Sequence, residues 1–155
     1  MGYLIILRGP AGAGKTTVSK CLIETLGSDK TFSLDLDITL DKENEFSDNL
    51  NKALGYENVV GMMFWGLEHT QAPQQWIDRF KDKGYVILSV ILHANLETLV
   101  QRVKNRGYDY KDAVEMRRHF NNFEKIKSVF ANKARVEEVI INHRKVGIRR
   151  RKRRN

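Results

Sequence analysis

The stretch GPAGAGKT at residues 9–16 directly follows the apolar run YLIIL at residues 3–7. It fits the pattern G-x-x-x-x-G-K-[ST], whose last fixed positions are Gly14, Lys15 and Thr16. A strand-like run before the pattern and a helix-like spacing of apolar residues after it are the context in which this pattern binds phosphate. We therefore predict a phosphate-binding loop between a strand and a helix.

The residue types of this loop suit the binding of magnesium-ATP. Glycine lacks a Cβ and tolerates positive φ, so backbone N–H groups can converge on phosphate oxygens, helped by the positive end of the following helix. Lys15 would neutralise the β- and γ-phosphates, and the Thr16 hydroxyl would ligate Mg²⁺. The predicted nucleotide-binding residues of the loop are Gly9, Pro10, Ala11, Gly12, Ala13, Gly14, Lys15, Thr16 and Thr17.

The composition is that of a folded globular protein. The chain has 155 residues, 41% of them hydrophobic and 30% charged, which favours one domain with a core over disorder. The single cysteine, Cys21, excludes an internal disulfide, and we expect it on the apolar face of the first helix as a core residue. The apolar start is too short for a signal peptide, and no segment approaches the ~20 apolar residues of a membrane span. We therefore expect a cytoplasmic protein without a membrane partner.

The positive charge is concentrated at the end of the chain. The formal net charge is +8, and the consecutive basic residues from Arg149 to Arg154 account for most of it. We predict one domain at residues 1–148 and a disordered basic tail at residues 149–155. Such a tail is suited to non-specific RNA or DNA contact.

Strand-like and helix-like patterns alternate along the chain. We expect strands at residues 3–7, 31–35, 58–65, 85–92 and 136–141, and helices between residues 15 and 27, 46 and 55, 70 and 84, 95 and 107, and 112 and 130. Asn95 is placed to cap the fourth of these helices. Five alternations imply right-handed crossovers and a parallel sheet with helices on both faces, an α/β three-layer sandwich. Such a sheet binds ligands beyond the carboxyl ends of its strands.

Two aspartates, Asp35 and Asp37, come at the end of the second expected strand. A carboxylate at this position can take the proton of an acceptor hydroxyl, or hold magnesium through water, for which Asp37 is the candidate. Alternation along an extended chain would put both carboxylates on one side. Either residue could be the base, and the alternative is a solvated turn, in which aspartate is common.

The segment around these aspartates is acidic and has no arginine. The acids are Asp35, Asp37, Asp41, Glu43, Glu45 and Asp48, and no arginine occurs between Gly9 and Asp78. An acceptor that already carries a phosphate normally needs an arginine fork. We therefore expect a neutral or cationic acceptor with a hydroxyl group.

Arg102 and Arg106 are spaced i and i+4 on the fourth expected helix, so they face the same way. They come just before the segment GYDY at residues 107–110, and they could close over the transferring phosphate and stabilise its developing charge. The alternative is ordinary surface pairing with acids such as Glu97 or Asp109.

Several functions are disfavoured by what the sequence lacks. The third expected strand, NVVGMMFWG at residues 58–66, ends without the aspartate that motor ATPases use to organise magnesium. No N-K-x-D guanine signature is present, because residues 142–145 read NHRK. The four histidines lack metal-ligand spacing. The sequence therefore disfavours an ATP-driven motor and a GTP switch.

With these motifs identified, the chain resembles the P-loop kinase group, which includes shikimate, gluconate and polynucleotide kinases, chloramphenicol phosphotransferase and zeta toxins. The matching segments are GPAGAGKTT at residues 9–17, LDLD at 34–37 and VILHANLETLVQRVKNRG at 90–107. The resemblance implies a sheet order of 2-3-1-4-5, ATP with Mg²⁺ as donor, and a lid after the fourth strand. It also implies that residues 142–146, among them Arg144, border the adenine.

The resemblance further implies roles for the candidate residues. Lys15 would be the phosphate-neutralising group, Asp35 or Asp37 the acceptor-binding base, and Arg102 with Arg106 the lid arginines. Polynucleotide kinases and zeta toxins usually have an arginine shortly after the aspartate of strand two, whereas residues 37–40 here read DITL. The resemblance therefore leaves the acceptor open.

Two functional hypotheses follow. The first is an ATP-dependent phosphotransferase that moves the γ-phosphate of magnesium-ATP to a hydroxyl of a small molecule or a nucleic-acid end. The second is a nucleotide-gated RNA- or DNA-binding protein that uses Arg149–Arg154 and hydrolyses ATP without transfer.

Overall fold

The computed structural model describes residues 2–9, 13–35, 43–63, 73–105, 118, 121 and 136–143. Its helices and strands, in chain order, are β1 (Tyr3–Arg8), α1 (Lys15–Leu26), β2 (Thr31–Asp35), α2 (Glu43–Ala53), β3 (Asn58–Met63), α3 (Pro73–Asp82), β4 (Val86–Ala94), α4 (Leu96–Asn105) and β5 (Glu137–His143).

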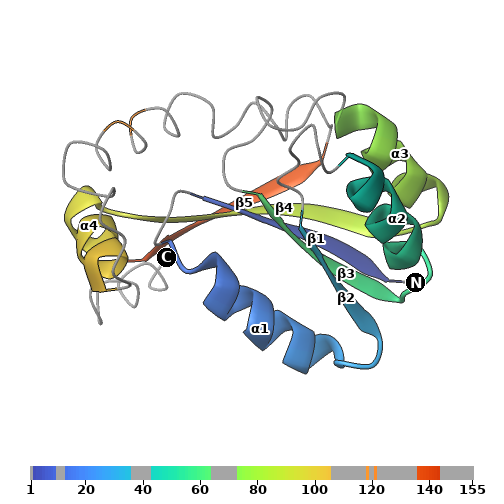
Figure 1. Ribbon diagram of the computed structural model, residues 1–155, viewed down its shortest axis with the longest axis horizontal. Coiled ribbons are helices and arrows are strands. Elements are labelled where there is room, and N and C mark those ends of the chain that lie inside the picture. Colours follow the sequence, from blue (N-terminus) through green and yellow to red (C-terminus); the bar gives the residue numbers. More distant parts are fainter. Residues whose placement is uncertain are drawn as a thin grey trace, which may run out of the picture.

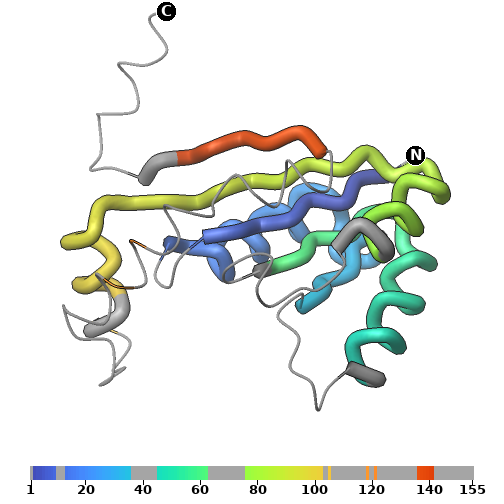
Figure 2. Tube along the Cα trace, turned by 90° about the horizontal axis from the view of Figure 1, so that it is seen from above, coloured from blue at the N-terminus to red at the C-terminus, as the bar shows by residue number. Residues whose placement is uncertain are grey.

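The strands form one five-stranded sheet in the order β2-β3-β1-β4-β5, and every neighbouring pair is parallel. Figure 2 shows this order from one edge of the sheet to the other. Helix α1 lies on one face, and α2 and α3 lie on the opposite face (Figure 1). The predicted α/β three-layer sandwich with strand order 2-3-1-4-5 is therefore confirmed.

Each face of the sheet has its own core, because successive side chains of a strand point to opposite faces. One core joins the strands to α2 and α3 through Leu4, Ile6, Leu34, Val59, Ile87, Leu50, Ala53, Trp76, Ile77 and Phe80. The other joins the strands to α1 through Leu7, Val60, Val90, Val18, Leu22, Ile23 and Leu26. These sides are called the α2–α3 face and the α1 face below.

Most predicted elements are present, with shifted ends. Strand β4 begins at Val86 rather than at Tyr85, because Gly84 adopts φ +87° and the Tyr85 N–H bonds the Phe80 carbonyl in the turn after α3. It continues to Ala94, beyond the apolar run, because it stays paired with β5. Pairing, rather than apolar character, thus decides where these strands stop.

The prediction that Cys21 is a core residue is wrong, because this side chain is exposed. The inward side of α1 is formed by Val18, Leu22 and Leu26, with Ser19 buried beside them. Each residue turns the helix by about 100°, so Cys21 lies roughly that far around from Leu22. One position thus separates a core side chain from a surface thiol.

The predicted start of α4 and the predicted end of α1 agree with the structure. The Thr98 N–H donates to Asn95 Oδ1 at 2.9 Å, so Asn95 caps α4 as expected, and Leu99 of that helix is buried. Gly27 ends α1 with φ +108°. No helix among the described residues is long and apolar enough to cross a membrane. The helix expected at 112–130, apart from helical residues 118 and 121, and the tail at 149–155 lie outside the described residues.

Candidate functional site

The phosphate-binding loop begins where β1 meets the backbone of β4. Gly9 is buried, and a Cβ at this position would lie 2.3 Å from the Leu92 carbonyl oxygen. A distance that short excludes any side chain unless a strand moves. The first glycine of the motif is therefore needed for the close approach of two strands, a reason additional to phosphate binding.

The last glycine of the loop is needed for its backbone conformation. Gly14 adopts φ +100° and ψ +18°, the left-handed conformation, and it is the N-cap of α1. The Val18 N–H donates to the Gly14 carbonyl at 3.0 Å, which starts the helix. The first turn of α1 contains no acidic residue, so the positive end of the helix is available to an anion.

Lys15 joins the two ends of the loop. Its Nζ donates to the Gly9 carbonyl oxygen at 2.6 Å, and the side chain is half-buried. Thr16 and Thr17 are exposed at the start of α1, and Ala13 is buried in the core of the α1 face. The structure thus brings together six of the nine predicted loop residues, and residues 10–12 lie outside the described part of the chain.

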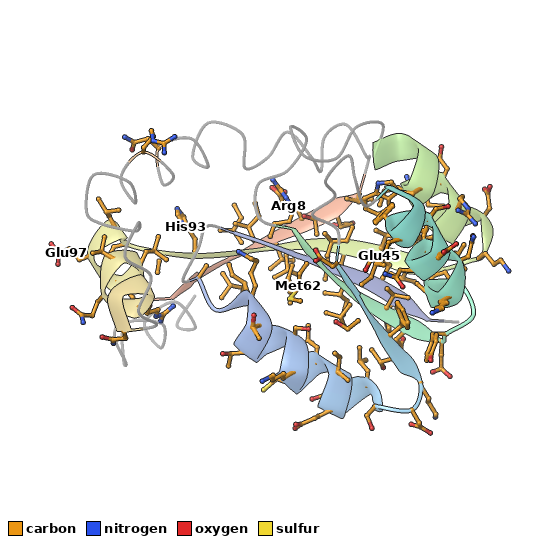
Figure 3. All side chains as sticks on the ribbon, in the orientation of Figure 1. Arg8, Glu45, Met62, His93 and Glu97 are labelled. Carbon is orange, nitrogen blue, oxygen red and sulfur yellow. The ribbon has the colours of Figure 1, made fainter. Side chains whose placement is uncertain are left out.

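Asp35 lies at the same end of the sheet as the loop. It is the exposed last residue of β2 and is in register with Met62 of β3, which is in register with Leu7 of β1. Two strand spacings separate Asp35 from Leu7, which corresponds to about 10 Å. In Figure 3 the Met62 side chain points towards α1. Asp37 lies outside the described residues, so the common orientation of the two carboxylates stays a prediction.

The predicted lid arginines are described only in part. Arg102 is half-buried on α4, and α4 lies at the carboxyl end of the sheet, the end at which α1 begins (Figure 1). Arg106 and Arg144 lie outside the described residues. Their roles in the lid and at the adenine stay predictions.

The structure adds one charged residue that the sequence analysis missed, Arg8. It ends β1, directly before the loop, and its side chain is completely buried. Its Nη1 lies 3.4 Å from Glu138 Oε2, an ion pair that joins β1 to β5 across β4. Burial lowers the pKa of Arg8 to about 10, and the Glu138 carboxylate partly opposes this shift. Arg8 is therefore a buried cation at neutral pH.

Two polar residues of β4 are buried on the same face as Arg8. Figure 3 shows Arg8 and His93 on the α2–α3 side of the sheet, opposite Met62. Ser89 is fully buried two residues before Ile91, the partner of Arg8 in register, and its Oγ makes no hydrogen bond within the described structure. We call Arg8, Ser89, His93 and Glu138 the Arg8 cluster.

Arg8 directly precedes the arginine-free segment, which begins at Gly9. The available signal was a cation at the last position of an apolar strand, directly before a phosphate-binding motif. Among the described residues no group of three or more His, Cys, Asp or Glu side chains could hold a metal. Of the two predicted magnesium ligands, Thr16 is described and its hydroxyl is exposed, whereas Asp37 lies outside the described residues.

Comparisons with known proteins agree with this geometry. The chain is 28% identical to the guanylate kinase of Rickettsia bellii over 149 residues, covering 75% of each protein. Its structure is similar to the YorR protein of Bacillus subtilis in complex with phosphorylated GDP, with a TM-score of 0.61, 19% identity and coverage of 90% of this chain and 85% of that one.

A second solved structure supports the same fold. The shikimate kinase of Acinetobacter baumannii, in complex with shikimate, matches with a TM-score of 0.55 and 20% identity, and covers 99% of this chain and 90% of that one. No protein-family model matches the chain. The loop motif, the strand order and these neighbours together place the fold. The fold of the chain is therefore that of the P-loop kinases.

Proposed function

We propose that this protein is an ATP-dependent kinase that transfers the γ-phosphate of magnesium-ATP to a hydroxyl group of a small molecule or a nucleic-acid end. The observation that carries the proposal is the conformation of the loop. Gly14 is left-handed at the start of α1, and the Lys15 ammonium lies across the loop on the Gly9 carbonyl. This arrangement places the positive end of α1 and the Lys15 ammonium at the described ends of the loop.

The donor would be held by three groups with different tasks. Backbone N–H groups and the start of α1 would bind the phosphate oxygens, and Lys15 would exchange the Gly9 carbonyl for the β- and γ-phosphates. Thr16 is exposed and offers a hydroxyl oxygen, the kind of ligand that Mg²⁺ prefers. Magnesium would neutralise charge on the bridging oxygens when bound.

The acceptor would be activated from β2. Asp35 is exposed at the carboxyl end of the sheet, where its carboxylate could take the proton of the attacking hydroxyl. Asp37 is the alternative base, and it could also contribute to the metal site. Arg102, together with Arg106, would stabilise negative charge on the transferring phosphoryl group.

A labelled-ATP transfer screen tests the proposal. Wild-type protein is incubated with ATP carrying a labelled γ-phosphate and with nucleosides, sugars, aminoglycosides and RNA ends. Lys15→Met should lower the transfer rate by at least about 1,000-fold, because the charge that stabilises the phosphates is lost. Lys20→Met, which removes an exposed lysine of α1 outside the loop, should leave the rate unchanged.

The proposal is wrong if no acceptor is labelled although ATP is bound. If ATP is instead hydrolysed and the rate depends on RNA, the nucleotide-gated RNA- or DNA-binding hypothesis is favoured. Deleting residues 149–155 would then reduce both RNA affinity and its salt dependence. Dependence on ATP also favours a cytoplasmic location, which stays a prediction.

A further inference from the structure

We infer that Arg8 binds a phosphate group of the acceptor, so that the preferred acceptor is an anion rather than a neutral or cationic hydroxyl compound. The inference rests on the proposed kinase activity and concerns the acceptor class of the same site. It follows from the position of Arg8, from its burial, and from the groups around it.

The position of Arg8 is suited to this role. It directly precedes Gly9, so a group bound to it lies beside the loop that holds the donor phosphates. In Figure 3 it also lies beyond the part of the α2–α3 face that α2 and α3 cover. Asp35 ends the strand two places away in the sheet order, about 10 Å across. Asp35 is in register with Met62 and Leu7, which face α1, so its carboxylate and Arg8 lie on opposite faces of the sheet. A nucleoside with one phosphate would therefore have to pass over the carboxyl ends of the strands to place its hydroxyl at Asp35 and its phosphate at Arg8.

The burial of Arg8 makes its charge effective. A guanidinium that is completely enclosed attracts an anion more strongly than an exposed one, because water does not screen the interaction. Its planar fork of N–H donors matches the oxygens of a phosphate. The Nη1–Oε2 distance to Glu138 is 3.4 Å, longer than the about 2.7–2.9 Å of a strong charge-assisted hydrogen bond. A phosphate could therefore replace this contact with a better one.

The other residues of the Arg8 cluster fit an anion-binding site. The Glu138 carboxylate would limit the affinity of this site for an anion. The fully buried Ser89 Oγ makes no hydrogen bond within the described structure and could donate to a phosphate oxygen. His93 is buried on the same strand. Glu138 opposes an anion, so it sets the acceptor affinity and neutralises Arg8 while no acceptor is bound.

A matched set of three probes tests the inference: guanosine, guanosine 3′-monophosphate and guanosine 5′-monophosphate. Guanosine is the base and sugar of the acceptor named by the guanylate kinase relative. The wild-type protein should use at least one monophosphate with a KM about 10- to 100-fold lower than that of guanosine, the range expected for hydrogen bonds to a charged group. The position of the new phosphate in the product shows whether the hydroxyl or the existing phosphate received it.

Substitutions then assign the effect to Arg8. Arg8→Met should remove the preference for the monophosphate by raising its KM about 10- to 100-fold, while the KM values for ATP and guanosine stay unchanged. Arg8→Lys should keep part of the preference for the monophosphate, because the positive charge remains. Glu138→Gln should lower the KM for the monophosphate. Arg79→Met, which removes an exposed arginine of α3, is the control for loss of one positive charge.

Two outcomes would overturn the inference and leave the kinase proposal standing. In one, the wild type phosphorylates guanosine or another neutral acceptor at least as well as the monophosphates. In the other, Arg8→Met raises the KM values for ATP and for both acceptors equally, which indicates a structural role. Failure of the kinase proposal gives a different result, because no acceptor would be labelled and Lys15→Met would behave like the wild type. If Arg8→Met does not fold, the opposite shifts expected of Arg8→Lys and Glu138→Gln decide the question.

Discussion

The two ends of the sheet are built differently. At the amino end, buried Asn58 accepts the Tyr3 N–H through its Oδ1 at 3.0 Å, and its own N–H donates to the Lys30 carbonyl. The Val86 N–H donates to the Gly2 carbonyl at 2.9 Å. These contacts join β1 to β3, β3 to the turn that precedes β2, and β4 to the residue that precedes β1. The buried Thr31 Oγ1 is an exception, a neutral hydroxyl without a hydrogen bond in the described structure.

At the carboxyl end, the buried polar groups are of another kind. Arg8 is a completely enclosed cation, and Ser89 and His93 are buried nearby. Burial costs free energy for such groups unless strong partners offset it. The amino end is thus joined by hydrogen bonds between neutral groups, whereas the carboxyl end encloses the Arg8–Glu138 ion pair. Variants at the two ends should therefore separate stability from activity.

The largest effect on stability should come from Gly9→Ala. This variant tests whether the carboxyl end of the sheet also contains a residue that is needed for packing alone. Its Cβ would lie 2.3 Å from the Leu92 carbonyl oxygen, so β1 or β4 must shift at a cost of about 3 kcal/mol. Gly55→Ala is the control, because the nearest atom to its Cβ is the Lys52 carbonyl oxygen at 3.4 Å. Urea denaturation measures both variants. Equal midpoints would show that the strands do not approach as closely as described.

Removing Glu138 and removing Arg8 should change the free energy of unfolding by different amounts. Glu138→Gln leaves a buried cation with less compensation and should cost about 2 kcal/mol of unfolding free energy. Arg8→Met removes the buried charge. The lowered pKa of Arg8 means that its protonated form is less stable in the folded chain than in the unfolded one, so this variant should lose less than about 1 kcal/mol or gain stability. A larger loss for Arg8→Met, measured at pH 7, would contradict this order.

At the amino end, Asn58→Ala should affect stability and leave activity alone. The Tyr3 N–H would lose its part-buried acceptor, the side chain of buried Asn58, which costs about 1.5 kcal/mol. The rate of phosphate transfer by the folded protein should equal that of the wild type. Glu57→Ala, at the exposed neighbouring residue, serves as the control. A changed KM for ATP would show that the two ends are coupled.

Tyr85→Phe should have a smaller effect than Asn58→Ala, about 1 kcal/mol. The Tyr85 hydroxyl donates a hydrogen bond to the Tyr56 carbonyl oxygen. It also lies 3.3 Å from the Ala53 carbonyl oxygen. Burial raises the pKa of Tyr85 above 10, so the stability that depends on its proton is present below pH 10 and is lost as pH rises through the folded-state pKa. The difference between Tyr85→Phe and wild type should therefore shrink between pH 8 and pH 11. A constant difference would exclude this proton linkage.

Local patterns were sufficient to predict much of the fold. Strand β2 matches the predicted residues 31–35 in full, and Asn95 caps α4 as expected. In both cases the deciding residues lie within a few positions of one another. The exposure of Cys21 was predicted wrongly because the apolar stripe of α1 is centred one residue further along the helix.

Features that depend on distant partners could not be predicted in this way. The Arg8–Glu138 pair joins positions 130 residues apart, and the bond from Tyr3 to Asn58 spans 55 residues. The residues next to each partner in the sequence do not indicate either of these two contacts. The strand order was available only through the resemblance to known kinases, because alternation alone fixes a parallel sheet and not its sequence of strands.

The contact between Gly9 and the backbone of β4 has a mechanical consequence. Leu92, which Gly9 touches, is three residues before Asn95, the cap of α4. The donor loop packs against the last residues of β4, and α4 follows directly from them. This short piece of β4 therefore sets the position of α4 relative to the loop. Arg102 on α4 would then act as a charge held at constant distance from the loop, rather than as one brought in by bending between β4 and α4.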